Sequence, residues 1–363
     1  MSTDHRPRPP GPTRPSRAGS PSARLRVHDP GELIAAVPHL LGFTPEASIV
    51  LVAVHGRGRR RGLGVVARAD LPAPGDVDAL AAGCATPVAA SGPQEVMAIV
   101  VAEPAPDGEP PRPDVVAAVG AAFGERGIPV RSRLWVPRIA AGVRWRCYPP
   151  CDCAGSVASP DDSPLAAEMA WRGRITHASR GEMEGSLAPA VPPRLPELVR
   201  AEHEAARLDR ELGGPAAARR DLAAVVAARD EVAAGRPLGD EELARLAVAL
   251  GDPGVRDTVM GWALDPDEAV ADAAERLWTQ LVRALPEPDV AEPAILLACA
   301  LLVRGGSALV TVALDRALAA DPGHRLTRLI DSLLASGMGP DALRTLVRES
   351  SDEAAAQLRG RAG

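Results

Sequence analysis

Three short runs dominated by Val, Ile, Leu and Ala near the start of the chain constrain its fold more than any other feature of the sequence. They are ASIVLVAV at 47–54, GLGVVARADLP at 62–72 and EVMAIVVA at 95–102. Short runs rich in Val and Ile, bounded by Gly, Pro and Asp, are typical of β-strands. Strands that are apolar on both faces need covering helices on both sides. We therefore predict an α/β domain with a mixed sheet and flanking helices.

Helices are predicted between and beside these runs. Asp29 suits the N-cap of a first helix, and Gly42 suits its left-handed C-cap. Pro38 lies inside this helix, so we expect it to kink the helix or to end it early. Two further helices are predicted near 76–90 and 113–126, and two further strands within IPVRSRLWV and GVRWRCY.

The second half of the sequence has a different character. From about Pro196, Ala, Leu, Arg and Glu recur at helical spacing, and breaks such as GRPLGD, GDPG and LPEPD separate the segments. This pattern predicts an all-α domain of several short helices packed antiparallel. We expect five regions: a disordered Pro/Arg/Ser-rich tail at 1–25, the α/β domain at 26–155, a connector at 156–195, the helical domain at 196–350 and a flexible tail at 351–363.

The composition excludes several mechanisms. The chain has no Lys, so it has neither the lysine of a P-loop nor the amine of a Schiff-base enzyme. Its longest apolar run, PAILLACALLV, is too short to span a bilayer, and its Arg-rich start lacks the apolar core of a secretion signal. We therefore expect a cytoplasmic protein with no membrane partner.

Aromatic residues make up only 2% of the chain, and this scarcity of stacking surfaces argues against nucleic acid as a partner.

Three of the five cysteines, Cys147, Cys151 and Cys153, lie close together in WRCYPPCDCAGS. Thiolates are favoured ligands of zinc, so this cluster supplies three of the four ligands of a structural zinc site. The fourth ligand would come from His177, Asp152 or another part of the chain. However, the C-x3-C-x-C spacing is not that of a standard zinc knuckle. A reactive thiol and simple packing at the end of a strand are the alternatives, and packing is the preferred interpretation.

The loop HGRGRRRG carries four arginines as candidate ligand or partner contacts: Arg57, Arg59, Arg60 and Arg61. Its glycines imitate a dinucleotide-binding fingerprint. However, the third glycine comes one residue late, and the loop leads into a strand rather than a helix. A solvated hairpin tip is therefore the preferred interpretation.

Asp70 and Arg180 are two further candidates for ligand or partner contacts. Asp70 ends a strand, where α/β folds often place active residues, although it also suits a turn cap before Pro72. Arg180 follows Ser179 in THASRGEME. Because Ser179 and Glu182 have the spacing of a capping box, the start of a helix is preferred over a nucleophilic serine.

Several stretches resemble a known family when they are taken in order: DPGELIAAVPHLLGF, SIVLV, RADLP, the cysteine cluster, SPLAAEMAWRGRITHASRGEMEGSL and GGSALVTVALDRALAADPGHRLTRLIDSLL. Together they are similar to an actinobacterial family known as domain of unknown function 4192, from Arg26 to about Leu346. The resemblance implies a bacterial cytoplasmic protein and assigns no catalytic residue. The chain has CDCAG where the family usually has a doubled cysteine, and RGGS where the family has a Gly-Asp-Gly-like turn.

Two functions from different classes are consistent with the sequence. The first is a non-catalytic regulatory or protein-interaction module, in which both domains form a surface for another protein. It is preferred because the sequence shows no complete catalytic constellation. The alternative is a metal-dependent enzyme or small-ligand binder that uses a cleft between the two domains. Asp70, the cysteine cluster and His177 would line that cleft.

Overall fold

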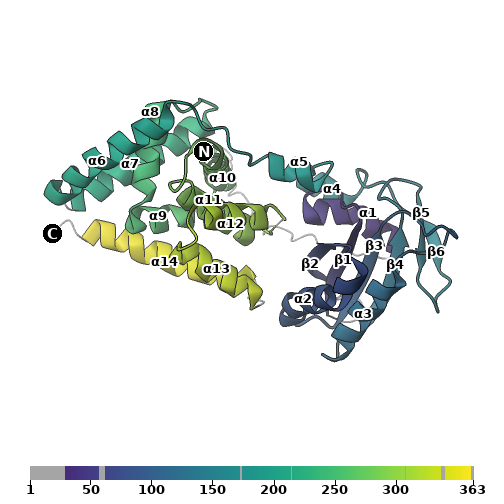
Figure 1. The fold of residues 1–363 in the computed structure, drawn as a ribbon. Helices are drawn as coiled ribbons and strands as arrows, with labels where there is room; N and C mark the ends of the chain where they lie inside the picture. Colours follow the sequence, from purple (N-terminus) through teal and green to yellow (C-terminus); the bar gives the residue numbers. More distant parts are fainter. Residues whose placement is uncertain are drawn as a thin grey trace, which may run out of the picture.

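The computed structural model describes residues 29–56, 62–171, 174–213, 215–306, 308–336 and 340–360. These residues form two bodies that lie side by side (Figure 1). One body contains a sheet with helices on both faces, and the other is built from helices. The four loop arginines at 57–61 and the predicted tail at 1–25 lie outside the described residues.

The first body is organised around one mixed sheet of six strands in the order β2-β1-β3-β4-β5-β6. β1 pairs antiparallel with β2 and β3, β3 pairs parallel with β4, and β5 and β6 continue antiparallel. The predicted mixed sheet is confirmed, and the last short strand was not predicted. The strands are β1 (Ser48–His55), β2 (Gly62–Asp70), β3 (Glu95–Val101), β4 (Val130–Val136), β5 (Arg144–Cys147) and β6 (Ala154–Ser156).

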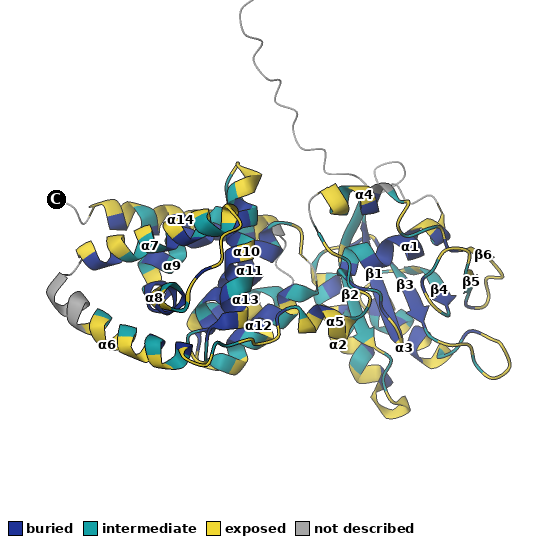
Figure 2. Cartoon of the chain, turned by 90° about the horizontal axis from the view of Figure 1, so that it is seen from above, coloured by how far each residue is buried: buried dark blue, intermediate teal, exposed yellow. Residues whose placement is uncertain are grey.

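Both faces of this sheet are covered, as the apolar runs predicted. Because side chains alternate along a strand, Val50 and Val52 of β1 pack with the core on the α1 side. Ile49 and Leu51 pack on the other side, against the two following helices. Figure 2 shows the central strands β1 and β3 as mainly buried, whereas the edge strand β2 is only partly buried. The covering helices are α1 (Pro30–Leu41) on one face, and α2 (Val77–Ala90) and α3 (Pro113–Gly124) on the other; a short 3-10 helix, η2 (Pro74–Asp76), precedes α2.

Helix α1 lies between Asp29 and Gly42, the two caps that its sequence predicted. The Asp29 carboxylate accepts a hydrogen bond from the Gly31 amide at 2.9 Å, and Gly42 closes the helix with φ 84°. The helix does not end at Pro38 but continues to Leu41. Leu33, Ile34, Val37 and Leu41 are all buried, and their packing stabilises the last turn despite the hydrogen bond that a proline cannot donate.

The second body is helical, as predicted, but several of its helices are long rather than short. Helix α11 is apolar on every side and lies at the centre of this body's core, with almost all of its residues buried. Trp262 and Trp278 stack with their ring centroids 5.9 Å apart. The helices are α6 (Leu195–Gly213), α7 (Pro215–Ala233), α8 (Asp240–Leu250), α9 (Pro253–Met260), the 3-10 helix η3 (Gly261–Leu264), α10 (Glu268–Ala284), α11 (Ala291–Val303), α12 (Leu309–Ala320), α13 (Arg325–Ala335) and α14 (Pro340–Gly360).

The flexible tail predicted at 351–363 is wrong for residues 351–360, which belong to α14. Ala354 and Leu358 are buried, and they lie four residues apart on one face of the helix. The Leu358 side chain packs close to Gly254 of α9. A helix with few large apolar residues therefore stays ordered because those few face the core.

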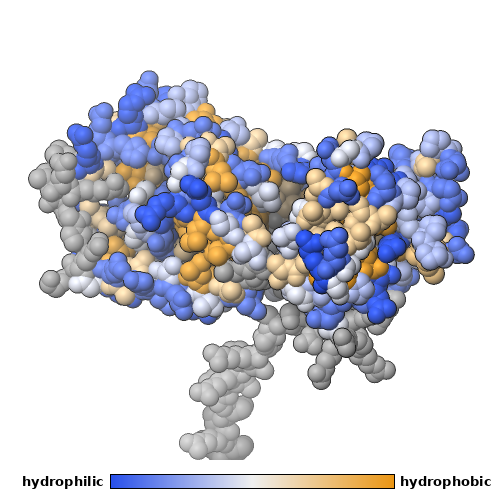
Figure 3. Space-filling view, turned by 60° about the horizontal axis from the view of Figure 1, so that its bottom comes forward, coloured by the Kyte–Doolittle hydropathy of each residue, from blue (hydrophilic) through white to orange (hydrophobic). Residues whose placement is uncertain are grey.

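A connector with helices α4 (Pro164–Trp171) and α5 (Arg180–Gly185) joins the bodies, and the bodies also contact each other directly. The Ala308 amide donates to the Leu41 carbonyl at 3.1 Å. Leu309 and Val312 of α12 pack against the core on the α1 side of the sheet. In the view of Figure 3 the surface is largely hydrophilic, with separate apolar patches on both bodies. No described helix is both long and apolar enough to cross a membrane.

Candidate functional site

A tight hairpin between β5 and β6 brings the three clustered cysteines together. β5 ends at Cys147, whose amide donates to the Cys153 carbonyl at 2.8 Å. Cys151 lies in the turn, where its amide donates to the Tyr148 carbonyl at 3.3 Å. The Tyr148 amide donates to the Arg133 carbonyl of β4 at 2.9 Å, which anchors the hairpin to the sheet.

The three thiol groups converge on one point. The Sγ atoms of Cys147, Cys151 and Cys153 all lie within 4.8 Å of one another, and all three cysteines are free. Cys147 is partly buried, and Cys151 and Cys153 are exposed. The preferred sequence interpretation, simple apolar packing, does not describe two solvent-exposed thiols whose sulfur atoms converge.

Hydrogen bonds within the trio favour one thiolate. The pKa of Cys151 is lowered, chiefly because the Cys153 thiol and amide donate to its sulfur; the amide contact is 3.5 Å. The pKa of Cys147 is raised to about 12, mainly by burial and then by the neighbouring Cys151. The pKa of Cys153 is also raised, because its proton is held in the hydrogen bond to Cys151. The hydrogen bonds thus favour ionisation of Cys151 over that of Cys147 and Cys153.

Two carboxylates lie beside the sulfur atoms. A hollow of about 170 Å³ next to the trio is lined by Glu109, Arg146 and Asp152 as well as the cysteines. Glu109 is held by an ion pair with Arg146 at 3.0 Å. Asp152 lies between Cys151 and Cys153 in sequence, and its negative charge acts to raise the pKa of both thiols, an effect that the hydrogen bonds outweigh at Cys151. A metal ion bound to the three sulfur atoms would therefore have carboxylate oxygens in the same hollow.

His177, the first candidate for the fourth zinc ligand, is not part of this cluster. Its amide donates to Gly42 and its carbonyl accepts from Thr44, so it pairs with the segment that leads into β1. β1 lies next to edge strand β2, and the cysteines lie between β5 and β6 at the other edge of the sheet. Among the described residues, the converging group contains only the three cysteines. The sequence could not show this, because nothing in the spacing fixes the order of the strands.

Asp70 and Arg180 do come together, but not with the cysteines. An oxygen of Asp70, at the end of β2, lies 3.9 Å from the Arg180 guanidinium, which also pairs with Glu184 at 2.7 Å. Arg68 donates to the other Asp70 oxygen. Because β2 and β6 form opposite edges of the sheet, the predicted cleft that Asp70 shares with the cysteines is not formed.

Ser179 begins helix α5, as its spacing predicted. Its hydroxyl accepts a hydrogen bond from the Glu182 amide at 3.1 Å, and the Glu182 carboxylate accepts from the Ala178 amide at 2.6 Å. The Ser179 hydroxyl and the Glu182 carboxylate thus each accept a backbone amide at the start of α5. This is the role of a helix cap and not that of a nucleophilic serine.

Sequence reasoning missed a polar network in the helical body. His324 pairs with Glu292 through Nε2 at 3.2 Å and with the Thr327 hydroxyl through Nδ1 at 2.6 Å. Thr327, His324 and Glu292 are arranged in the order of the nucleophile, base and orienting acid of a catalytic triad. However, Thr327 is 0% exposed, and the His324 ring also accepts from its amide as the N-cap of α13. The network is therefore a helix cap, and the signal for it in the sequence was the His-x-x-Thr spacing before an amphipathic segment.

These features define a two-body protein in which a mixed α/β sheet with an exposed cysteine hairpin is joined to an all-helical body. The sequence pattern of one family, Domain of unknown function (DUF4192), matches residues 30–341. The chain belongs to this family, as the order of its motifs indicated. No curated protein and no solved structure matches the chain.

Proposed function

We propose that this protein binds a soft divalent metal ion of the zinc class through Cys147, Cys151 and Cys153. The observation that supports this is the convergence of three sulfur atoms within 4.8 Å of one another. Zn–S bonds of about 2.3 Å in a tetrahedron separate two sulfur atoms by about 3.8 Å. Small rotations of the two exposed side chains reach that spacing without moving the strands.

The fourth ligand in this proposal is the Asp152 carboxylate or a water molecule. Asp152 lines the hollow beside the sulfurs, and Glu109, which also lines it, is engaged by Arg146. A site with three thiolates and a weak fourth ligand lies open to solvent at the edge of the sheet. Such a site stabilises the β5–β6 hairpin, and neither the ion nor the hairpin has to perform catalysis.

Elemental analysis of the untagged full chain tests this function. We expect close to one zinc per chain, and loss of the metal in Cys147→Ser, Cys151→Ser and Cys153→Ser. Cys84→Ser and Cys299→Ser remove the other two thiols and are expected to keep the metal, because neither belongs to the trio. Folded protein that neither retains zinc nor takes it up when zinc is added contradicts the proposal.

A second candidate function, a protein-interaction module, is supported by a different observation. Trp171 and Ile175 on the connector are 77% and 74% exposed, although both are large and apolar. Exposed apolar patches mark interfaces with other proteins, and Trp is enriched among the residues that contribute most to binding there. The five free cysteines suit the reducing cytoplasm, where we place both the protein and its partner.

Comparison of partners isolated from the native cell tests this second function. A specific partner is expected to co-purify with the wild-type chain and with Leu329→Ala, which alters another exposed apolar residue. The double variant Trp171→Ala/Ile175→Ala is expected to lose it. If the double variant keeps every specific partner of the wild type, the connector is not the interface.

A further inference from the structure

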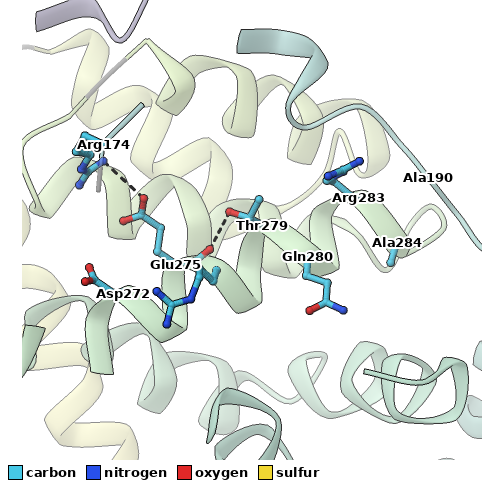
Figure 4. Close-up of a pocket in the computed structure, with 9 residues that line it drawn as sticks. Arg174, Ala190, Asp272, Glu275, Thr279, Gln280, Arg283 and Ala284 are labelled. Atoms are coloured by element: carbon cyan, nitrogen blue, oxygen red, sulfur yellow. Dashed lines mark hydrogen bonds and ion pairs between the residues drawn. The ribbon is translucent and has the colours of Figure 1, made fainter. Parts of the chain in front are cut away.

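A cavity larger than the hollow beside the cysteines lies along helix α10, on the second body. Its volume is about 530 Å³, within the range of small-molecule sites. One wall is the exposed face of α10, and the other comes from the connector at Arg174 and Ala190 (Figure 4). The Ala190 amide donates to the Arg283 carbonyl at 2.6 Å, which fixes one end of the connector to the helix.

The two acidic residues that line this cavity are already paired. Glu275 accepts from Arg304 at 2.9 Å and lies 3.6 Å from Arg174, the ion pair drawn in Figure 4. Asp272 pairs with the second nitrogen of the same Arg304 guanidinium. The negative charge of Asp272 and Glu275 is thus balanced by Arg174 and Arg304.

Two further arginines on the same helix have no acidic partner among the described residues. Arg276 and Arg283 both line the cavity and are exposed, and neither guanidinium has an ion pair or hydrogen bond within the part of the chain that the structure describes. They lie seven residues apart, which places them on one face of α10 and about 10 Å apart along its axis. When Arg304 beside the cavity is counted with the lining residues, two positive charges remain in excess, on Arg276 and Arg283, separated by two helical turns.

The residues between the two arginines add neutral polar groups. The Gln280 amide lines the cavity, and it has no hydrogen bond within the described residues. The Thr279 hydroxyl donates to the Glu275 carbonyl at 2.8 Å, so its oxygen can still accept. Arginine binds carboxylate and phosphate oxygens in a two-pronged geometry, and an amide donor between two arginines complements such a ligand.

We propose that this cavity binds a small molecule with at least two oxyanion groups, one held by Arg276 and one by Arg283, with the Gln280 amide as a donor between them. Phosphate and carboxylate groups share this chemistry. A nucleic acid fits less well, because no aromatic residue lines the cavity and, among the described residues, only two of its three arginines are without an ion pair. The site is separate from the cysteine hairpin, so it does not depend on metal binding.

Isothermal titration calorimetry of the full chain tests the site with three probes: inorganic tripolyphosphate, citrate and inorganic phosphate. Recognition at two points predicts that tripolyphosphate or citrate binds at least about tenfold more tightly than phosphate, since each charge-assisted hydrogen bond contributes about that factor or more. Preference for tripolyphosphate identifies a phosphorylated ligand, and preference for citrate identifies a polycarboxylate. Absence of binding for all three probes, or equal affinity for all three, overturns the proposal.

Variants separate the cavity from general charge attraction. Arg276→Ala and Arg283→Ala are each expected to weaken binding at least about tenfold, and Arg276→Lys is expected to restore only part, because lysine keeps the charge but loses the two-pronged geometry. Arg325→Ala/Arg328→Ala removes two exposed arginines from α13 and serves as the matched control. If this control weakens binding as much as Arg276→Ala or Arg283→Ala does, the cavity is not the site.

Discussion

The Cys147 amide donates to the Cys153 carbonyl at 2.8 Å, and this backbone hydrogen bond pairs the first and last cysteines of the trio across the hairpin. It also leaves Asp152 in the turn beside the exposed sulfurs. We predict that Asp152→Asn weakens zinc binding by about tenfold or more, because groups that coordinate or orient a metal ligand have effects of that size. Competition with a calibrated chelator measures the change.

His177→Ala is the matched variant for this prediction. His177 lies beside β1, towards the other edge of the sheet, so its loss is expected to leave the zinc affinity unchanged. A large loss of affinity in His177→Ala, with the fold intact, would mean that the hairpin meets that histidine in solution and that the strand order described above is wrong.

Gly31 in the first turn of α1 is predicted to tolerate no side chain. A Cβ atom at this position would lie 2.2 Å from the carbonyl oxygen of Ser156 in β6 and 3.2 Å from Nε1 of Trp145. The first contact is with backbone, so either the helix or the edge strand must shift. We expect Gly31→Ala to lower the free energy of unfolding by about 1–3 kcal/mol, the usual cost of overpacking.

Gly83 provides the control for this prediction. It lies inside α2, and a Cβ atom there would meet nothing within 4 Å. Gly83→Ala is therefore expected to stabilise the protein by about 0.5–1 kcal/mol, because alanine loses less conformational freedom in a helix. Chemical denaturation of both variants checks the pair, and equal effects would show that α1 does not pack against β6 this closely.

The sequence predicted those features that depend on local pattern. The apolar runs predicted a sheet covered on both faces, and Asp29 and Ser179 were placed correctly as caps, because a cap depends only on residues within one turn. The early end expected at Pro38 does not occur, because packing that no short window of sequence shows outweighs the cost of the proline.

The features that depend on strand order were not predicted. The sequence offered His177 as one candidate for the fourth ligand beside the cysteines, yet the sheet separates them. Conversely, Asp70 and Arg180 lie far apart in the sequence and meet within 3.9 Å. The α10 cavity was also not predicted. The sequence does not show that Asp272 and Glu275 pair with Arg304, and therefore does not distinguish Arg276 and Arg283 from other exposed arginines on helices.

The ion pair between Arg112 and Asp114 predicts a pH-dependent contribution to stability. Two nitrogens of Arg112 donate to the two Asp114 oxygens, each at 3.0 Å, and this contact lowers the pKa of Asp114 below its ordinary value of 3.8. A lowered carboxyl pKa stabilises the folded state above the ordinary value, and the contribution is lost as the pH falls through the folded-state pKa.

Asp114→Asn is therefore expected to be less stable than the wild type at pH 7, and the difference is expected to vanish in acid. The pair is partly exposed to solvent, so the expected loss is about 1 kcal/mol or less. Thermal unfolding across the acid range measures it, with Asp161→Asn as a control at an exposed aspartate that has no ion pair within the described residues. A difference that grows in acid contradicts the assignment.

The contact between the two bodies is predicted to depend on apolar packing rather than on the Asp70–Arg180 ion pair. Leu309 and Val312 of α12 pack against the core of the α/β body, whereas Arg180 and Asp70 are separated by 3.9 Å at a solvent-exposed position. Exposed ion pairs contribute about 0–1 kcal/mol. Arg180→Ala is therefore expected to leave the contact between the two bodies intact.

Val312→Asp is expected to open that contact, because it places a carboxylate against the aliphatic side chains that Val312 packs against. Small-angle X-ray scattering should show a larger radius of gyration for Val312→Asp than for Arg180→Ala or the wild type, and limited proteolysis should cut its connector faster. Circular dichroism must show that the helices are retained, since opening is meant to separate two folded bodies. If Arg180→Ala opens the protein and Val312→Asp does not, the ion pair holds the bodies together and the apolar contact is incidental.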